Sequence, residues 1–257
     1  MALSDHFREL RARLIRCILV VVVVFVVALF FYDELIDVVL RPYNIARDQL
    51  GEDVSTKPVI NNAGGPLMVQ LKLCGVAALV VCSPYWLYQL WAFILPGLRP
   101  QERKWSRVFA AIAGPLFIAG VVLGYYVMPK GLEVLIGFTP QDMENLVEFG
   151  AYTSFLARML LVFGIAMEIP VFMVMLNLAG VISGKQIARH RAWIIIGTFV
   201  FAAVATPSTD PFSMLMLALP MLALFVISEI IARTVDRVRG RRAADTEQWD
   251  DDEVSPL

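Results

Sequence analysis

Six long apolar segments constrain what this chain can fold into more than any other feature of its sequence. A transmembrane helix needs about 20 mainly apolar residues, because each residue advances the helix by about 1.5 Å across a hydrocarbon core of about 30 Å. Only 18% of the residues are charged, against about a quarter in soluble domains. We therefore predict an all-α, polytopic integral membrane protein with six transmembrane helices. The predicted spans cover approximately residues 15–32, 67–95, 108–128, 151–179, 192–206 and 212–231.

The distribution of basic residues predicts the orientation of these spans. Sixteen of the 22 Lys and Arg fall in the N-terminal segment, in the 99–107 and 183–191 connections, or after residue 231. Lys and Arg are enriched in the cytoplasmic connections of membrane proteins. We therefore expect a multi-pass protein of the cell membrane with both termini in the cytoplasm.

Polar segments are predicted at both ends of the membrane domain. Residues 1–14 have the pattern of a cytoplasmic amphipathic helix that lies at the membrane surface. The six-span membrane domain would then cover residues 15–231. Residues 232–257 end in an acidic, polar stretch, which is typical of a largely disordered cytoplasmic tail.

The last two spans are predicted to be short. Residues 192–206 would form a helix of about 22 Å, which is less than the thickness of the hydrocarbon core. A turn from Pro207 to Pro211 then leads into the sixth span. We expect a recessed hairpin or local thinning of the bilayer beside these two spans.

Two acidic connections lie on the predicted non-cytoplasmic side. The first has about 35 residues, with helix signals near 34–40, and should form a small cap of its own. The second covers residues 129–150. Within the spans, prolines predict a break or kink at Pro84 and a kink at Gly114-Pro115. Pro170 lies inside the fourth span, where it frees a backbone carbonyl.

The sequence lacks the motifs of the common enzyme classes. It has no nucleophile elbow, zinc-protease helix, Walker loop or Gly-rich dinucleotide turn. Its two histidines, His6 and His190, both fall near the predicted cytoplasmic surface, which disfavours a His-based metal or catalytic site. We therefore predict a protein that is not an enzyme and that uses no cofactor or metal.

Acidic residues are scarce on the predicted cytoplasmic face. The ordinary explanation for Glu9 is an i,i+4 ion pair with Arg13, and for Glu102 it is a solvated loop carboxylate among basic residues. Together the two carboxylates indicate a site for a cationic ligand, because a planar guanidinium binds a carboxylate through two parallel hydrogen bonds. Such a site could hold two adjacent arginines.

Glu168 lies near the middle of the fourth span, where a carboxyl group is costly. It could be a structural carboxyl, hydrogen-bonded within the bundle, or it could have a functional role. The alternative function is a secondary transporter or channel in which Glu168 binds an ion or a proton. The sequence shows no internal repeat, which disfavours that alternative. Lys72 and Arg158 lie near span ends and could reach the interface by snorkelling.

Five motifs follow one another in an order that is typical of one family. HFRELRARL at the N-terminus is similar to a His-Leu-x-Glu-Leu-Arg-x-Arg signature, with Phe7 in place of Leu, and FGIAMEIPV is similar to a Phe-Gly-x-x-Phe-Glu-x-Pro segment. The stretch that begins at Gln89, QLWAFILPGLRPQER, is similar to a first cytoplasmic-loop motif. TPSTDPFS and ALPM resemble the start and the middle of a final span. Together they resemble the TatC family, the receptor core of the twin-arginine protein translocase.

The resemblance implies a glove-like bundle of six helices that binds signal peptides with paired arginines. It implies recruitment of small single-span partners of the TatA and TatB types, and export of folded proteins with the proton motive force. It also implies contact with membrane lipids and self-association in a multimeric receptor complex, with no role for nucleic acid.

The resemblance also implies roles for individual residues. Signal-peptide binding falls to Glu9, Glu102, Arg11, Phe93 and Arg103. Glu168 would belong to an intramembrane polar site for partner helices. The family positions on the outer side, structural or periplasmic, are Pro42, Lys72 and Asp210.

Overall fold

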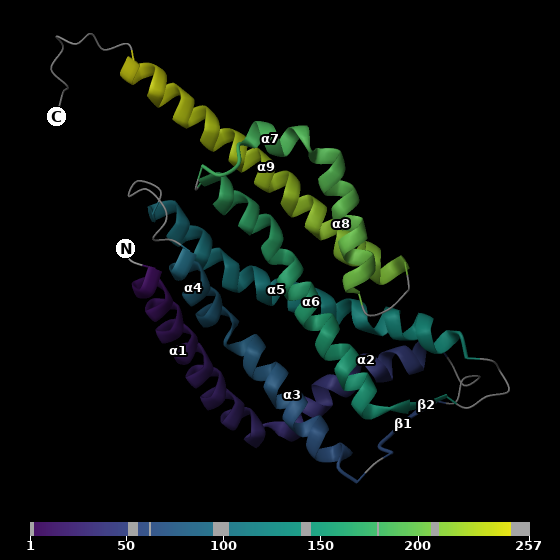
Figure 1. Cartoon of the computed structure of the whole chain (residues 1–257). Helices are drawn as coiled ribbons and strands as arrows, with labels where there is room; N and C mark the ends of the chain where they lie inside the picture. The colour runs from purple at the N-terminus through teal and green to yellow at the C-terminus, as the bar shows by residue number, and fades with distance from the viewer. Residues whose placement is uncertain are drawn as a thin grey trace.

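The computed structural model describes residues 3–50, 56–61, 63–94, 103–139, 145–178, 180–206 and 211–247. Figure 1 shows an elongated bundle in which α1 begins and α9 ends at one end, while the two strands lie at the other. We call these the termini end and the sheet end. In chain order the elements are α1 (Leu3–Phe30), α2 (Tyr32–Leu50), β1 (Thr56–Val59), α3 (Gly65–Val81), α4 (Ser83–Ile94), α5 (Arg103–Gly137), β2 (Asn145–Glu148), α6 (Phe149–Leu178), α7 (Gly184–Arg189), α8 (Arg191–Ala205) and α9 (Pro211–Glu247).

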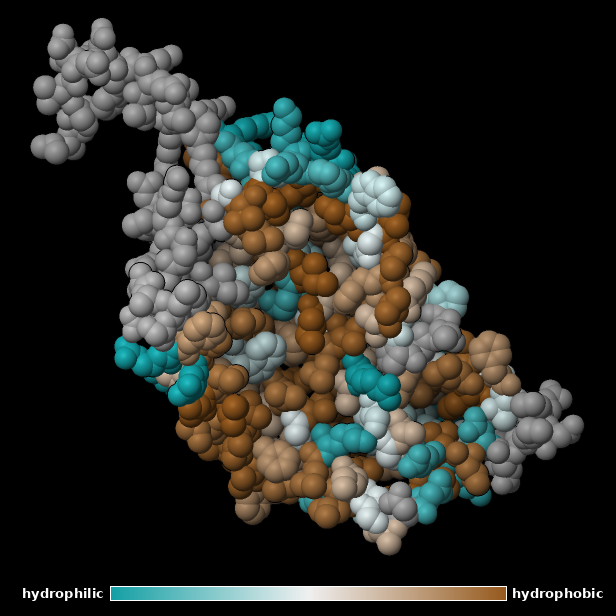
Figure 2. Space-filling view, viewed as in Figure 1, coloured by the Kyte–Doolittle hydropathy of each residue, from teal (hydrophilic) through white to brown (hydrophobic). Residues whose placement is uncertain are grey.

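The apolar helices confirm the predicted membrane class. In the described part of the chain, four segments are long and apolar enough to cross a bilayer: Phe7–Phe30, Ala111–Gly137, Phe149–Leu178 and Pro211–Val238. The bent pair α3–α4 is also long and apolar enough and counts as a fifth where its two helices form one broken span, and the short apolar helix α8 lies at the predicted fifth span. Figure 2 shows hydrophobic residues covering most of the visible face, with hydrophilic residues gathered toward the two ends.

The N-terminal helix is not separated from the first span. The sequence predicted a surface helix over 1–14 and a span from residue 15, but α1 is continuous from Leu3 to Phe30. No Pro or Gly occurs in this stretch, so nothing in the backbone favours a break. A helix was also predicted near 34–40, and α2 extends it to Leu50.

The second span is broken beside Pro84, as the sequence predicted. α3 and α4 meet at Cys82 with a bend of 57°, directly before Ser83-Pro84. Proline has no N–H to continue the helical hydrogen bonds, and its ring displaces the carbonyl four residues earlier. Across from it, a Cβ on Gly114 would lie 2.9 Å from the Cα of Pro84, so α5 approaches this bend closely.

The third span is longer than predicted. The span was predicted to end near residue 128, with a connection from residue 129, but α5 continues through Pro129 to Gly137. Leu132 and Ile136 are buried in the core on this extension, and Lys130 pairs with Glu133 at 2.7 Å. Packing and a local ion pair therefore compensate for the loss of the backbone hydrogen bond that Pro129 cannot donate. Pro115 does not interrupt α5 either.

The fifth span is short, as predicted, but the sixth helix is not. α8 has 15 residues, whereas α9 has 37 residues and continues to Glu247. The tail predicted to be disordered from residue 232 is therefore helical over 232–247. This stretch contains no proline and is rich in Ala and Arg, which favour helix.

A small sheet at the sheet end was not predicted. β1 and β2 pair in parallel, with Thr56 opposite Asn145 and Val59 opposite Glu148. The strands join the two acidic connections, of which the first was expected to form a small cap of its own. Each strand has only four residues, which is too short for a pattern in the sequence to be read.

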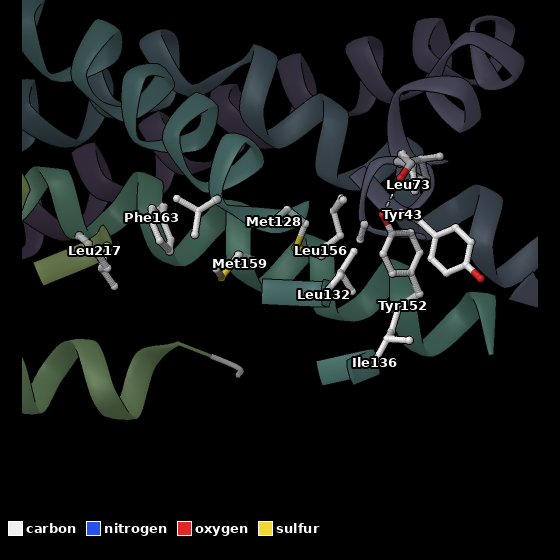
Figure 3. Close-up of a cluster of buried hydrophobic side chains, with 14 of the residues drawn as sticks. Tyr43, Leu73, Met128, Leu132, Ile136, Tyr152, Leu156, Met159, Phe163 and Leu217 are labelled. Carbon is white, nitrogen blue, oxygen red and sulfur yellow. Dashed lines mark hydrogen bonds between the residues drawn. The ribbon is translucent and has the colours of Figure 1, made fainter. Parts of the chain in front are cut away.

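The core lies where α5 and α6 cross. Figure 3 shows its buried side chains, to which α2, α3, α5, α6 and α9 all contribute. Glycines bring α5 and α6 together: a Cβ on Gly120 would lie 2.5 Å from the carbonyl oxygen of Phe163, and one on Gly164 would lie 2.7 Å from the ring of Phe117. Small residues at such crossings let helix backbones pack closely in lipid.

This contact predicts that Gly120→Ala lowers the thermal stability of the purified protein in detergent. The added methyl group meets backbone atoms, so the helices must separate, at a cost of about 1–3 kcal/mol. Gly75→Ala on α3 is the matched control, because a Cβ there meets nothing within 4 Å. Equal melting temperatures for the two variants would contradict this account of the α5–α6 crossing.

Candidate functional site

A polar bridge joins α1 to α4 near the termini end. The Arg13 guanidinium donates to Glu9 Oε1 from Nε at 3.0 Å and from Nη2 at 2.6 Å. Its third bond, from Nη1, ends on Oε1 of Gln89 at 2.9 Å. The i,i+4 pair was the ordinary explanation predicted for Glu9, whereas the link to Gln89 was not predicted. Glu9 is therefore held beside α4 rather than free in solvent.

Phe93 and Arg11 lie on the two helices that the bridge joins. Phe93 follows Gln89 by four positions on α4, so the two side chains share a helix face. Arg11 is exposed on α1, and Arg103 is the first residue of α5. Glu102 lies outside the described residues, so its distance from Glu9 stays a prediction.

One oxygen of Glu9 remains open to a further donor. Both bonds from Arg13 end on Oε1, and Oε2 accepts none from the described part of the chain. The side chain of Glu9 retains 32% of its exposure. A carboxylate can accept several hydrogen bonds, so a second cation could bind without displacing Arg13.

Glu168 is a polar group inside the bundle. It lies on α6, and both of its carboxyl oxygens are buried without a hydrogen-bond partner among the described residues. A structural carboxyl hydrogen-bonded within the bundle was one expectation for it, and the described part of the chain supplies no such bond. Nearby, Ser228 of α9 donates to the carbonyl oxygen of Pro170 at 2.9 Å. Burying a polar group without a partner is costly, so Glu168 is a candidate for contact with another polar group.

Pro42 has a structural position on α2. It is buried inside the helix, and a proline there leaves the carbonyl of Val38 without its usual donor. The hydroxyl of Tyr125 donates to that carbonyl at 2.8 Å. The neighbouring Val39 carbonyl accepts from Tyr152 at 2.6 Å. Two tyrosines from α5 and α6 therefore anchor α2 to the bundle.

Lys72 contacts protein atoms near the sheet end. Its Nζ donates to Ser154 Oγ at 2.5 Å and to the Gly150 carbonyl oxygen at 3.4 Å. Snorkelling was the expectation for this residue, and it instead links α3 to α6. Asp210 lies outside the described residues.

An ion network around Glu229 was missed from the sequence. Glu229 on α9 is 3% exposed and accepts from Arg191 at 2.6 Å and from Arg233 at 2.6 Å. The i,i+4 spacing of Glu229 and Arg233 could have predicted their ion pair from the sequence. Arg191 lies 38 positions away, and nothing local links it to Glu229.

A second acid of α9 secures the α6–α7 turn. Asp236 accepts from the backbone N–H of Gly184 at 2.6 Å and from the Asn177 amide at 3.0 Å. A Cβ on Gly184 would lie 2.7 Å from the backbone nitrogen of Arg233, so the turn sits directly on α9. The helix extension beyond residue 231 therefore has a packing role.

The sequence and the fold of this chain are similar to those of one known protein family. A family model described as Sec-independent protein translocase protein (TatC) matches residues 5–220. The chain is 39% identical over 267 residues to the Sec-independent protein translocase protein TatC of Frankia casuarinae, which covers 100% of this chain and 73% of that protein. Its identity to the TatC of Xylanimonas cellulosilytica is 36%, over 95% of this chain and 88% of that protein.

A solved structure has the same fold. A crystal structure of the twin-arginine translocase receptor TatC in DDM matches with a TM-score of 0.71 and 29% identity, over 88% of this chain and 99% of that one. Fold and similarity together define a helical, multi-pass component of a protein-translocation system. The chain belongs to the TatC family of Sec-independent protein translocases. The family expected from the sequence motifs is confirmed, and a translocase component is favoured over a small-solute transporter.

The Glu229 network predicts that Glu229→Gln destabilises the protein by about 1–3 kcal/mol, because two guanidinium groups lose their shared carboxylate. Thermal unfolding in detergent measures the effect. Glu133→Gln is the matched control, since it removes an i,i+3 pair with Lys130 at the surface and should cost less than about 1 kcal/mol. A larger loss at Glu133 than at Glu229 would be inconsistent with this network.

Proposed function

We propose that this chain is the receptor subunit of the twin-arginine translocase and binds twin-arginine signal peptides at the termini end, which faces the cytoplasm. The observation that carries the proposal is the placement of Glu9. Arg13 fixes this half-buried carboxylate against Gln89 of α4, one turn before Phe93. A peptide that reached the end of α4 would meet the carboxylate at a defined position.

The chemistry of the bridge fits a guanidinium ligand. Glu9 already accepts a guanidinium from its own chain, with two hydrogen bonds from Arg13. Its second oxygen would accept one arginine of the peptide, and Glu102 would accept the other. Phe93 would contact the apolar part of the signal peptide. Arg11 and Arg103 lie close to Glu9 and Glu102 in the sequence. Their positive charges would repel a cationic ligand, so that only a ligand that binds both acids would be held.

Binding of a twin-arginine peptide should fall in Glu9→Ala and in Glu102→Ala, each by about tenfold, the change expected for loss of a hydrogen bond between charged groups. Glu102→Lys should bind more weakly than Glu102→Ala, because it places like charges together. Crosslinking of a labelled peptide to the purified protein measures the effect.

Two controls accompany this experiment. A peptide with both arginines replaced by glutamine reports binding that does not depend on guanidinium, and Glu133→Ala removes a carboxylate near the sheet end. Unchanged crosslinking in both Glu9→Ala and Glu102→Ala would refute the site.

We also propose that Glu168 contacts partner helices. The partners are small single-span proteins of the TatA and TatB types, which assemble with this chain and with further copies of it to export folded proteins with the proton motive force. An unsatisfied carboxyl group inside the membrane domain supports the proposal, because a polar side chain on a partner helix would give it the hydrogen bond it lacks.

Glu168→Ala should therefore reduce copurification of single-span partners several-fold, by about the 1–2 kcal/mol of one interhelical hydrogen bond. Glu168→Gln should retain more of the partner, because the amide still donates and accepts. The melting temperature of the isolated chain should not fall in either variant, since Glu168 makes no bond within the described residues. Normal partner recovery with Glu168→Ala would count against this contact.

A further inference from the structure

A small pocket lies between α3 and the first turns of α6, toward the sheet end. Its volume is about 290 Å³, and Met68, Lys72, Glu148, Gly150 and Ser154 are among the residues that line it. No residue here belongs to the proposed signal-peptide or partner sites. The pocket is therefore separate from both proposed sites.

The cationic side of the pocket is already oriented. Lys72 Nζ is held by Ser154 Oγ at 2.5 Å and by the Gly150 carbonyl oxygen at 3.4 Å. An ammonium group has three protons, so one remains for a ligand. The Ser154 hydroxyl donates to the Gly150 carbonyl at 2.7 Å, which fixes it beside Lys72.

The anionic side is the carboxylate of Glu148. It lies over Gly150, since a Cβ on that glycine would be 3.4 Å from Glu148 Oε1. Lys72 and Glu148 both line the pocket and are both exposed to solvent, and within the described residues they make no ion pair with each other. The pocket therefore presents one cationic and one anionic side chain to a ligand, which is the complement of a zwitterion.

The pocket opens beside a surface suited to hydrocarbon. Leu67, Met68 and Leu71 of α3 are 58%, 64% and 42% exposed. In Figure 2 a small hydrophilic area interrupts the hydrophobic surface over the sheet-end part of α3 and α6. A charged pocket next to exposed apolar side chains, at the end of a membrane span, matches the level of lipid headgroups.

We propose that this pocket binds the phosphoethanolamine headgroup of a phospholipid. The phosphate would accept a hydrogen bond from Lys72, and the primary ammonium would donate to Glu148. The acyl chains would lie along the exposed apolar residues of α3. A headgroup with net negative charge would meet repulsion from Glu148, and a choline headgroup could not donate hydrogen bonds to it.

The test measures which lipids the protein retains. The chain is reconstituted in nanodiscs with equal amounts of ethanolamine, choline and glycerol phospholipids, extracted mildly, and analysed by native mass spectrometry. The wild type should retain the ethanolamine lipid in preference to the other two. Glu148→Gln should reduce this preference about tenfold, which is the change expected for one hydrogen bond to a charged group.

Further arms separate the outcomes. Lys72→Gln should reduce retention of all three lipids at this site, and Lys130→Gln and Glu133→Gln, which change the surface pair on α5, should reduce none. Excess soluble glycerophosphoethanolamine should not displace the lipid if the acyl chains contribute, and displacement would mean that the pocket takes the free headgroup instead. Equal retention of the three lipids by the wild type, or an unchanged preference in a folded Glu148→Gln variant, overturns the proposal.

Discussion

The close contact of α5 with α6 is the constraint on which the rest of the bundle depends. Inside a bilayer, lipid tails are as apolar as leucine, so helices associate through packing and hydrogen bonds rather than through exclusion of water. Gly120 and Gly164 allow backbone and ring atoms to approach where any side chain would collide. The large core residues, such as Phe163 and Met159, then fill the space on either side.

Polar contacts secure the outer helices to this central pair. Tyr125 and Tyr152 donate to neighbouring carbonyls of α2, and Pro42 has freed one of them. At the termini end, Glu229 and Asp236 of α9 fix the α7–α8 segment. The bundle thus combines a tightly packed centre with polar contacts at its edges. The Glu9 bridge and the Lys72 pocket lie at those edges, whereas Glu168 lies inside the bundle.

The sequence predicted what depends on local patterns. Apolar length located the spans, Pro84 located the break between α3 and α4, and i,i+4 spacing predicted the Glu9–Arg13 pair. It could not predict interactions between distant residues, such as the bond from Arg13 to Gln89, 76 positions away. The end of α5 was misplaced for the same reason, because buried Leu132 and Ile136 hold its extension beyond Pro129. The α9 extension instead follows a local signal, its helix-favouring Ala and Arg, and Asp236 binds it to the α6–α7 turn.

The parallel pairing of β1 and β2 has a consequence for biosynthesis. Thr56 pairs with Asn145, about 90 residues later in the chain, with α3, α4 and α5 between them. At about 5–20 residues per second, β1 waits on the order of 5–20 s for its partner strand to be made. During that time three helices must insert with the polar edge of β1 unpaired. The sheet therefore closes only after the first half of the protein is in the membrane, and its formation marks a late step in assembly.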